Sequence, residues 1–600
     1  MISPDDALDY TYAHSRTEAT TGYFSCEPPA ALSWEAALER LEACPLDDFL
    51  HQHCLRTLAG RGADALKTLA ATAYDAAHDA FRRPVLAALV LECALLVPEL
   101  AAAAAVFPPD AAQRLAAFTP LVYLRAAACP DAGAARQWNE LFRRNICDHH
   151  ALPRPEDVDL PPLYDAAAID GAQAVMRAQA GCLAAARERV AALGLPAWER
   201  PPAQDTFLRA TDALLEAGIL AGPEMRHQAS LSPIALLRTW RLDLRVSGGT
   251  GAQAVRHSLR GEATAYGRGL SLAQARASYS MEIVERASAY VDIRQPESAN
   301  APGEVGKRKQ PLPVIRASYA ALLAEGRAAL SPERLPLDAP FAGSCGPETP
   351  LHWVPAHDPA GGEVLVPAQA VFLFCNLEEP SLFLAAGSTG LASGNTVEEA
   401  KVAALVEILE RDAEATTPFS RRQCFTLCSQ DALLQSLLDD YAARGIRLQF
   451  QDMTTEFGIP VYQCFVMSRR GVVVRATGAG LSGRKAALAA LTETPWPYPY
   501  GEPTGPALAA LPQRCLEELP EWELDSPAAN LRLLEELLDA QGRTPLYVDL
   551  TRSDLDIPVV RAIIPGLELT GEPDSFSRPS PRLMARYLRE TDERAATPAP

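Results

Sequence analysis

Residues 390–413 decide the fold of this chain, and they read GLASGNTVEEAKVAALVEILERDA. A glycine-containing turn leads into Thr396, and Glu399 three residues later completes the pattern of a capped helix start. The helix that follows is apolar almost all round, which is typical of a buried helix. It nevertheless carries Glu407 and Glu410. Because unpaired carboxylates are costly on a buried helix, a positive group is expected to face them.

The helix motif occurs twice, 125 residues apart, as Glu282-x-x-Glu285-Arg286 and Glu407-x-x-Glu410-Arg411. The helix starts are in the same register, since Ser271 and Gln274 occupy the places of Thr396 and Glu399. One copy of the motif alone would be explained by an ion pair within its own helix, between residues four apart. These pairs would be Glu282 with Arg286 and Glu407 with Arg411. The duplication favours a shared site instead.

Divalent cations of the Mg²⁺ type prefer carboxylate oxygens and bridge them to phosphate. Two such helices that face each other predict Mg²⁺ on the phosphates of a nucleotide, with Arg286 and Arg411 neutralising the charge that develops during transfer. The turns before the helices, Gly267-Arg268-Gly269 and 390–395, are expected to bring backbone close to a ligand. The chain has no Walker-type phosphate loop and no kinase signature.

Residues 1–195 are rich in alanine and repeat apolar residues at helical spacing, for example over 34–44, 64–81 and 110–128. They predict an all-α domain that is structural or docks a partner, and stacked hairpins of the tetratricopeptide type are one possible form. The apolar run 85–97 is interrupted by Glu92 and too short to cross a bilayer, so it predicts a buried helix.

Residues 196–600 alternate strands with helices and predict a mixed α/β region. The polar stretch 296–313 is expected to be a mobile loop or an insertion. The predicted strands are 237–246, 363–374, 447–452, 460–467, 472–477, 545–550 and 557–564. The predicted helices are 205–217, 271–290, 396–413, 431–443, 483–494 and 526–540.

The net charge of −20 argues against a nucleic-acid surface, and the compact basic run 307–309 is interpreted as a solvated loop. The 13 cysteines are scattered without a zinc pattern, as in a reducing cytoplasm. The acidic N-terminus lacks the pattern of a secretion signal. A cytoplasmic protein without a membrane span is therefore expected.

Several separated motifs resemble the YcaO superfamily over about residues 199–575. The motifs are 390–413, the first acidic helix with Ser278, Glu282 and Glu285, the segment 547–568, and Arg200 with Thr206. The resemblance implies that Glu282, Glu285, Glu407 and Glu410 coordinate Mg²⁺. It also implies that ATP is contacted by Arg200, Thr206, Ser278, Asn395, Glu399 and Arg411.

The resemblance further implies an enzyme that acts on backbone amides of a peptide or protein. A thiol, a hydroxyl or external sulfide adds to an amide carbonyl, ATP phosphorylates the oxyanion, and loss of phosphate leaves an azoline or a thioamide. A partner protein for peptide recognition or sulfide delivery, and a homodimer, are both compatible with the family.

Three features depart from the family pattern. The helix 483–494 continues into Thr494-Pro495-Trp496 where the family usually has glutamine and arginine, and 597–600 is only a partial proline-rich tail. Residues 1–195 do not resemble the winged-helix peptide clamp of some members. The alternative function is therefore a non-catalytic accessory factor for a sulfur-transfer or ribosomal-protein modification enzyme.

Overall fold

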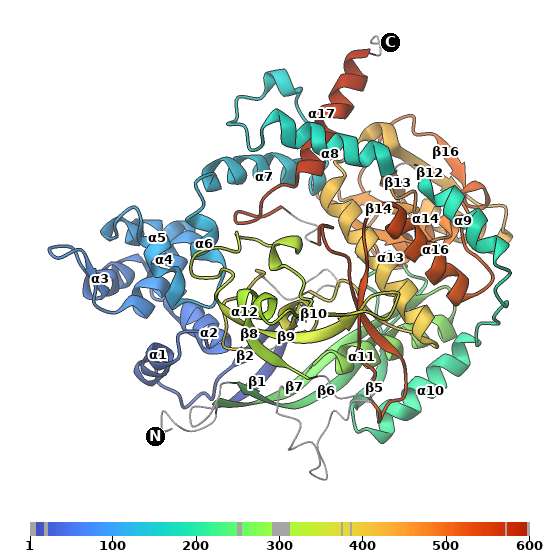
Figure 1. Cartoon of the computed structure of the whole chain (residues 1–600). Helices are drawn as coiled ribbons and strands as arrows, with labels where there is room; N and C mark the ends of the chain where they lie inside the picture. The colour runs from blue at the N-terminus through green and yellow to red at the C-terminus, as the bar shows by residue number, and fades with distance from the viewer. Residues whose placement is uncertain are drawn as a thin grey trace.

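The computed structural model of the chain describes residues 8–16, 22–179, 181–248, 255–290, 313–373, 376–384, 387–569 and 573–596. The stretch 296–312, with its basic run 307–309, and the terminal residues 597–600 lie outside these ranges. Within them the strands form three sheets of five or six strands and one two-stranded hairpin (Figure 1).

The first sheet has the order β2-β1-β7-β6-β5, and helices α10 and α11 pack against it. Ala263, Ala265 and Gly267 alternate as buried residues along β7, which leaves room for α11 above them. The elements are β1 (Leu8–Arg16), β2 (Gly22–Glu27), β5 (Leu220–Arg226), β6 (Ile234–Gly248), β7 (Val255–Gly269), α10 (Ala203–Glu216) and α11 (Leu272–Ser288).

Strands β1 and β2 correct the prediction that residues 1–195 are all helical. Strand β1 pairs in parallel with β7, so the start of the chain completes a sheet of the α/β region. Leu8, Tyr10 and Tyr12 alternate along β1 and are almost fully buried. This alternation is a strand signal that the alanine-rich composition of the following residues obscured.

The rest of residues 1–195 is mainly helical, as predicted. The helix expected over 64–81 ends at Ala73 and is followed by a hairpin, and the helix expected over 110–128 is divided into short segments. The α-helices are α1 (Trp34–Ala43), α2 (Asp48–Ala59), α3 (Ala63–Ala73), α4 (Pro84–Leu96), α5 (Ala111–Leu115), α6 (Tyr123–Ala127), α7 (Ala132–Ile146), α8 (Ala166–Gln179) and α9 (Cys182–Ala192). The hairpin is β3 (Tyr74–Asp75) with β4 (Ala80–Phe81).

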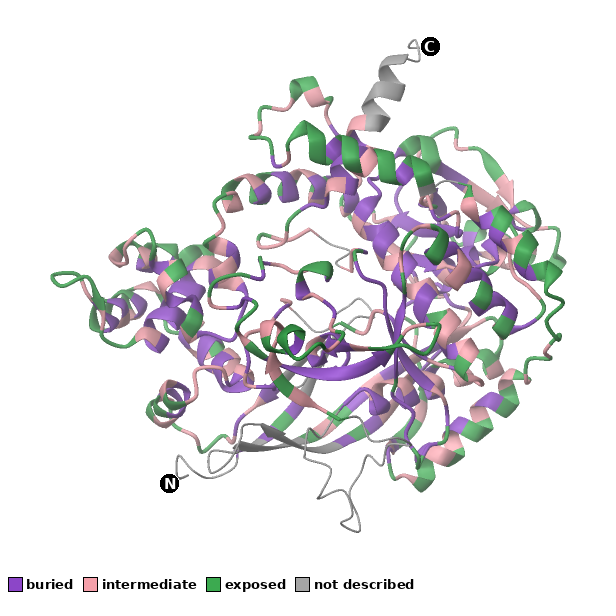
Figure 2. Cartoon of the chain, in the orientation of Figure 1, coloured by how far each residue is buried: buried purple, intermediate pink, exposed green. Residues whose placement is uncertain are grey.

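Helix α4 is the predicted buried helix, since every residue from Val85 to Ala94 is buried (Figure 2). Inside it, Glu92 Oε2 lies 2.6 Å from His51 Nε2, and its Oε1 accepts a hydrogen bond from Thr119 at 2.6 Å. Within the described ranges no helix has both the length and the apolar character needed to span a bilayer.

The second sheet has the order β10-β9-β17-β18-β11, with β8 beside β9. The predicted strand 363–374 ends at Pro367. The strands are β8 (Ile315–Ser318), β9 (Pro350–His357), β10 (Glu363–Pro367), β11 (Leu391–Ser393), β17 (Leu546–Asp549) and β18 (Val559–Ile563), and α12 (Tyr319–Ala324) follows β8.

The third sheet has the order β15-β14-β13-β12-β16 and is covered by α15. Helix α13 packs on β18 and β11 of the second sheet and also contacts β15 and α16, which explains its apolar circumference. These elements are β12 (Cys424–Cys428), β13 (Gln449–Asp452), β14 (Val461–Met467), β15 (Val473–Ala479), β16 (Gln513–Cys515), α13 (Val397–Thr416), α14 (Ala432–Ala443), α15 (Gly483–Glu493), α16 (Pro527–Ala540) and α17 (Pro581–Ala596).

Candidate nucleotide and metal site

The two acidic helices, α11 and α13, both contact strand β11. Ser271 and Gln274 form a complete capping box at the start of α11. In α13 the Thr396 hydroxyl accepts the backbone N–H of Glu399 at 3.1 Å, but the Glu399 carboxylate accepts the N–H of Asn395 at 2.7 Å. The capping box predicted for α13 is therefore only half formed, because the carboxylate reaches one residue further back.

Backbone groups lie close to three of the predicted carboxylates. Glu282 Oε2 accepts from the N–H of Tyr266 at 3.0 Å. The backbone of Ser393 is close enough to stabilise the charge of Glu285, and that of Gly390 is close enough to stabilise the charge of Glu407. The short segment around β11 thus lies near one glutamate of each helix, which brings the two motifs to one place.

Burial is the main cause of the raised pKa of all four carboxyl groups, Glu282, Glu285, Glu407 and Glu410. It raises the pKa of Glu285 to about 8, an increase that repulsion from Glu407 strengthens and Arg286 opposes. Burial also raises the pKa of Glu282, Glu407 and Glu410 above their ordinary value. Repulsion between Glu285 and Glu407 acts from one helix to the other. Such a group of acids favours binding of a cation.

Each helix contributes one arginine to this acidic region. Arg286 lies 3.2 Å from Glu285 and 3.9 Å from Glu282. Arg411 lies 2.6 Å from Glu414 and 3.3 Å from Glu410. The predicted ion pair of Arg411 with Glu407 is not among the ion pairs of the described residues. Arg411 pairs with Glu414 instead, a residue that was not predicted from the sequence.

The donor set fits Mg²⁺ that is shared with phosphate. In the described part of the chain no three His, Cys, Asp or Glu side chains lie close enough together to hold a metal ion by themselves. Mg²⁺ usually takes only one or two carboxylates and completes its shell with water and phosphate oxygens. Arg286 Nη1 is buried and lies 3.2 Å from Glu285 Oε1, so this arginine already places a positive charge beside the acidic group.

A second group of predicted residues meets at the start of α13. Arg200 Nε lies 2.7 Å from Glu399 Oε1, and the Thr206 hydroxyl donates to Asn395 Oδ1 at 3.0 Å. Glu399 and Glu407 are eight residues apart, which is about 12 Å along a helix. The two groups therefore lie at separate points along α13. Ser278 is exposed on α11, one turn before Glu282.

The glycines before the two helices make room for the protein's own backbone. A Cβ on Gly267 would lie 1.9 Å from the Ala275 carbonyl oxygen, and one on Gly394 would lie 2.5 Å from the Ala400 nitrogen. The glycine-containing turns predict a close approach of the backbone to a ligand. The structure shows that it is used for packing against α11 and α13.

Arg561, on β18, is a further charged residue of the site that the sequence analysis did not single out. It is almost fully buried and donates to the carbonyl oxygens of Ala370 and Gly387, each at 3.0 Å. Burial lowers its pKa to about 10, while attraction by Glu407 opposes this change. Glu493, at the end of α15, adds another acid that raises the pKa of Glu410 and Glu282.

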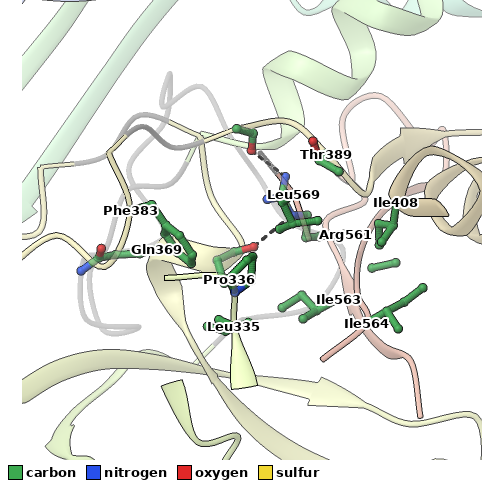
Figure 3. Close-up of a pocket in the computed structure, with 13 residues that line it drawn as sticks. Leu335, Pro336, Gln369, Phe383, Thr389, Ile408, Arg561, Ile563, Ile564 and Leu569 are labelled. Carbon is green, nitrogen blue, oxygen red and sulfur yellow. Dashed lines mark hydrogen bonds between the residues drawn. The ribbon is translucent and has the colours of Figure 1, made fainter. Parts of the chain in front are cut away.

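Arg561 also borders a cavity of about 90 Å³ (Figure 3). The cavity is lined mainly by apolar side chains, including Phe383, Ile563 and Ile408, the residue after Glu407. A cavity of this size is too small for a nucleotide, because even an apolar cavity of about 150 Å³ holds only a benzene-sized molecule.

Two curated proteins with related sequences were found. A protein of Methanothermobacter thermautotrophicus is 29% identical over 337 residues, which are 50% of this chain and 81% of that protein. A protein encoded in the region 3′ of tfuA in Rhizobium leguminosarum bv. trifolii is 31% identical over 177 residues, which are 26% of this chain and 42% of that protein.

The similar solved structures include the following two. A heterocyclase in complex with substrate and cofactor gives a TM-score of 0.43 at 18% identity, over 60% of this chain and 52% of the heterocyclase, so the match spans about half its length. YcaO from Methanopyrus kandleri bound with AMPPCP and Mg²⁺ gives a TM-score of 0.41 at 20% identity, over 61% of this chain and 91% of that protein.

The family model of the YcaO cyclodehydratases, described as ATP- and Mg²⁺-binding, matches residues 266–495 and 496–568. The matched residues make up half of the chain and include α11, α13, β11 and β18. ATP and Mg²⁺ are accordingly the cofactors of this protein. The chain belongs to the YcaO family.

Proposed function

We propose that the chain uses ATP and Mg²⁺ to activate backbone amides of a peptide or protein substrate by phosphorylating the amide oxygen. The products would be an azoline, where a side-chain thiol or hydroxyl is the nucleophile, or a thioamide, where sulfide is. The observation that carries the proposal is the meeting of Glu285 of α11 and Glu407 of α13 beside the two arginines.

An amide oxygen is a poor leaving group, and phosphorylation converts it into a good one. The nucleophile first adds to the carbonyl carbon, and the resulting oxyanion takes the γ-phosphoryl group while ADP leaves. Loss of phosphate then restores a double bond at the former carbonyl carbon, to nitrogen in an azoline and to sulfur in a thioamide. Negative charge develops on the amide oxygen and on the phosphoryl oxygens during these steps, so electrostatic stabilisation is the main task of the protein.

Each predicted residue has a role in this chemistry. Arg286 and Arg411 face the charge on the transferred phosphoryl group. Mg²⁺, when bound, neutralises phosphate charge. Its protein ligands are assigned to Glu282, Glu285, Glu407 and Glu410. The contacts to the rest of the nucleotide are assigned to Arg200, Thr206, Ser278, Asn395, Glu399 and Arg411.

The test compares Glu407→Gln with the natural protein. Mg²⁺-dependent binding of a fluorescent ATP analogue is measured first, and then phosphate release with peptides encoded by neighbouring genes. Removing one negative ligand is expected to weaken Mg²⁺–nucleotide binding severalfold or more and to abolish peptide-dependent phosphate release. Glu536→Gln, on the α16 helix that packs against α13, is the matched control and should resemble the natural protein.

Absence of Mg²⁺-dependent nucleotide binding by the natural protein would refute the proposal. Nucleotide binding without turnover on any candidate peptide, together with capture of a modification enzyme through residues 1–195, would favour the accessory function. The boundary near residue 195 and a homodimer remain predictions, which limited proteolysis and light scattering test directly.

A further inference from the structure

Helix α17 joins the acidic helix α13 through a buried ion pair. Arg582 Nη1 donates to Asp412 Oδ2 at 2.8 Å, and Nη2 bonds the other carboxylate oxygen. The Asp412 side chain is fully buried and that of Arg582 is 9% exposed. The pair is therefore a bidentate contact that water does not screen.

A second arginine of α17 extends the contact toward the end of α13. Arg586, one turn after Arg582, donates to the hydroxyls of Thr416 at 2.9 Å and Thr417 at 2.7 Å. Both arginines also pair with Glu456, which is 5% exposed. Two arginines, one turn apart on α17, thus bond the C-terminal end of α13.

The opposite side of α17 packs against the helices of the N-terminal region (Figure 1). Tyr587 packs on Trp138 and Phe142 of α7, and its hydroxyl donates to the Pro153 carbonyl oxygen at 2.9 Å. Helix α17 consequently has fixed supports on one side and α13 on the other.

The ion pair lies directly beside proposed site residues. Asp412 follows Arg411, the residue that contacts Glu410 and Glu414. Side-chain tips lie about 5–6 Å from a helix axis, so a rotation of α13 by about 10° would move Glu410 by about 1 Å. Displacements of about 1 Å at a reacting centre can cost about 100-fold in rate. A contact that fixes the rotation of α13 therefore matters for its function.

Buried ion pairs are poor sources of stability, because desolvation consumes most of their attraction. Their best-attested use is to specify one arrangement over close alternatives. We propose that Arg582 is a positioning residue, which acts through Asp412 to hold α13 where Glu410 and Arg411 meet the phosphates of Mg²⁺–ATP. This inference rests on the proposed function.

The test compares Arg582→Met with Arg578→Met. Arg578 belongs to the same C-terminal segment and bonds the Tyr164 hydroxyl and the Leu163 carbonyl oxygen, contacts that do not involve α13. The affinity for Mg²⁺ with a non-hydrolysable ATP analogue is measured by calorimetry at a temperature where all variants are folded. We expect Arg582→Met to weaken binding tenfold or more and to raise the Mg²⁺ concentration for half-saturation, whereas Arg578→Met stays within twofold.

Two further variants separate positioning from folding. Arg582→Lys keeps the charge without the bidentate geometry and is expected to recover part of the affinity. If Arg582→Met does not fold, Asp412→Asn, which keeps the shape of the side chain, is measured in its place with the same expectation. Thermal unfolding of each variant records the structural effect separately.

The inference is overturned if Arg582→Met, or Asp412→Asn in its place, loses thermal stability but binds Mg²⁺–nucleotide as tightly as the natural protein. Helix α17 would then be a structural support alone. Failure of the natural protein to bind Mg²⁺–nucleotide would be a different result, because it would refute the proposed function itself.

Discussion

Replacing Glu285 by glutamine is expected to stabilise the ligand-free protein at high pH and to reduce the stabilisation that Mg²⁺–nucleotide provides. Burial raises the pKa of Glu285 from its ordinary 4.5 to about 8, and its side chain is only 16% exposed. The folded protein therefore binds this proton more tightly than the unfolded chain does. Glu285 stabilises the fold fully below about pH 4.5, and this contribution is lost as the pH rises toward about 8.

The size of the effect follows from the pKa. A shift from 4.5 to about 8 corresponds to at most about 5 kcal/mol. Because buried sites respond as if their dielectric constant were about 20, we expect about 1–3 kcal/mol. Glutamine has the same shape and does not titrate. The ligand-free Glu285→Gln protein should thus be more stable than the natural one by this amount near pH 9, and about equal to it near pH 5.

With Mg²⁺ and nucleotide this advantage should shrink by about 1.4 kcal/mol or more, because the variant lacks a charged ligand and binding weakens tenfold or more. Thermal unfolding midpoints across this pH range, with and without Mg²⁺ and a non-hydrolysable ATP analogue, provide the assay. Glu536→Gln is the control and should follow the natural protein. A variant that is less stable at high pH without ligand, or equally stabilised by ligand, would contradict this account of Glu285.

Three other changes have expected outcomes. Gly267→Ala should prevent correct packing of α11 and lower the unfolding midpoint strongly, because a Cβ there meets a backbone oxygen at 1.9 Å, whereas Gly171→Ala in open space on α8 should add about 0.5–1 kcal/mol of stability. Thr206→Val removes the hydrogen bond to Asn395 and should weaken nucleotide binding severalfold in a binding assay, with little change in unfolding. Glu92→Leu removes the carboxylate that pairs with the buried His51 and Thr119 and should cost about 3–5 kcal/mol in denaturant unfolding. An unchanged midpoint would contradict a stabilising role of this buried pair.

Local sequence signals are sufficient to predict the elements that carry the site. The predicted helices 271–290 and 396–413 correspond to α11 (Leu272–Ser288) and α13 (Val397–Thr416), and the predicted strands 460–467 and 557–564 correspond to β14 and β18. These elements could be predicted because caps, glycine turns and apolar periodicity are local signals, which neighbouring residues decide. Each copy of the duplicated acidic motif could likewise be recognised from neighbouring residues alone.

Which of these residues meet depends on long-range packing that the sequence pattern does not reveal. Strand β1 joins β7 across some 250 residues of chain, Arg561 arrives beside Glu407 from β18, and Arg582 reaches Asp412 from the far end of the chain. None of these contacts leaves a periodic pattern, because each depends on the packing of sheets and helices that are distant in sequence. Charge type and helix register are fixed by the residues themselves, whereas desolvation and pairing, which set the chemistry of the site, exist only after packing.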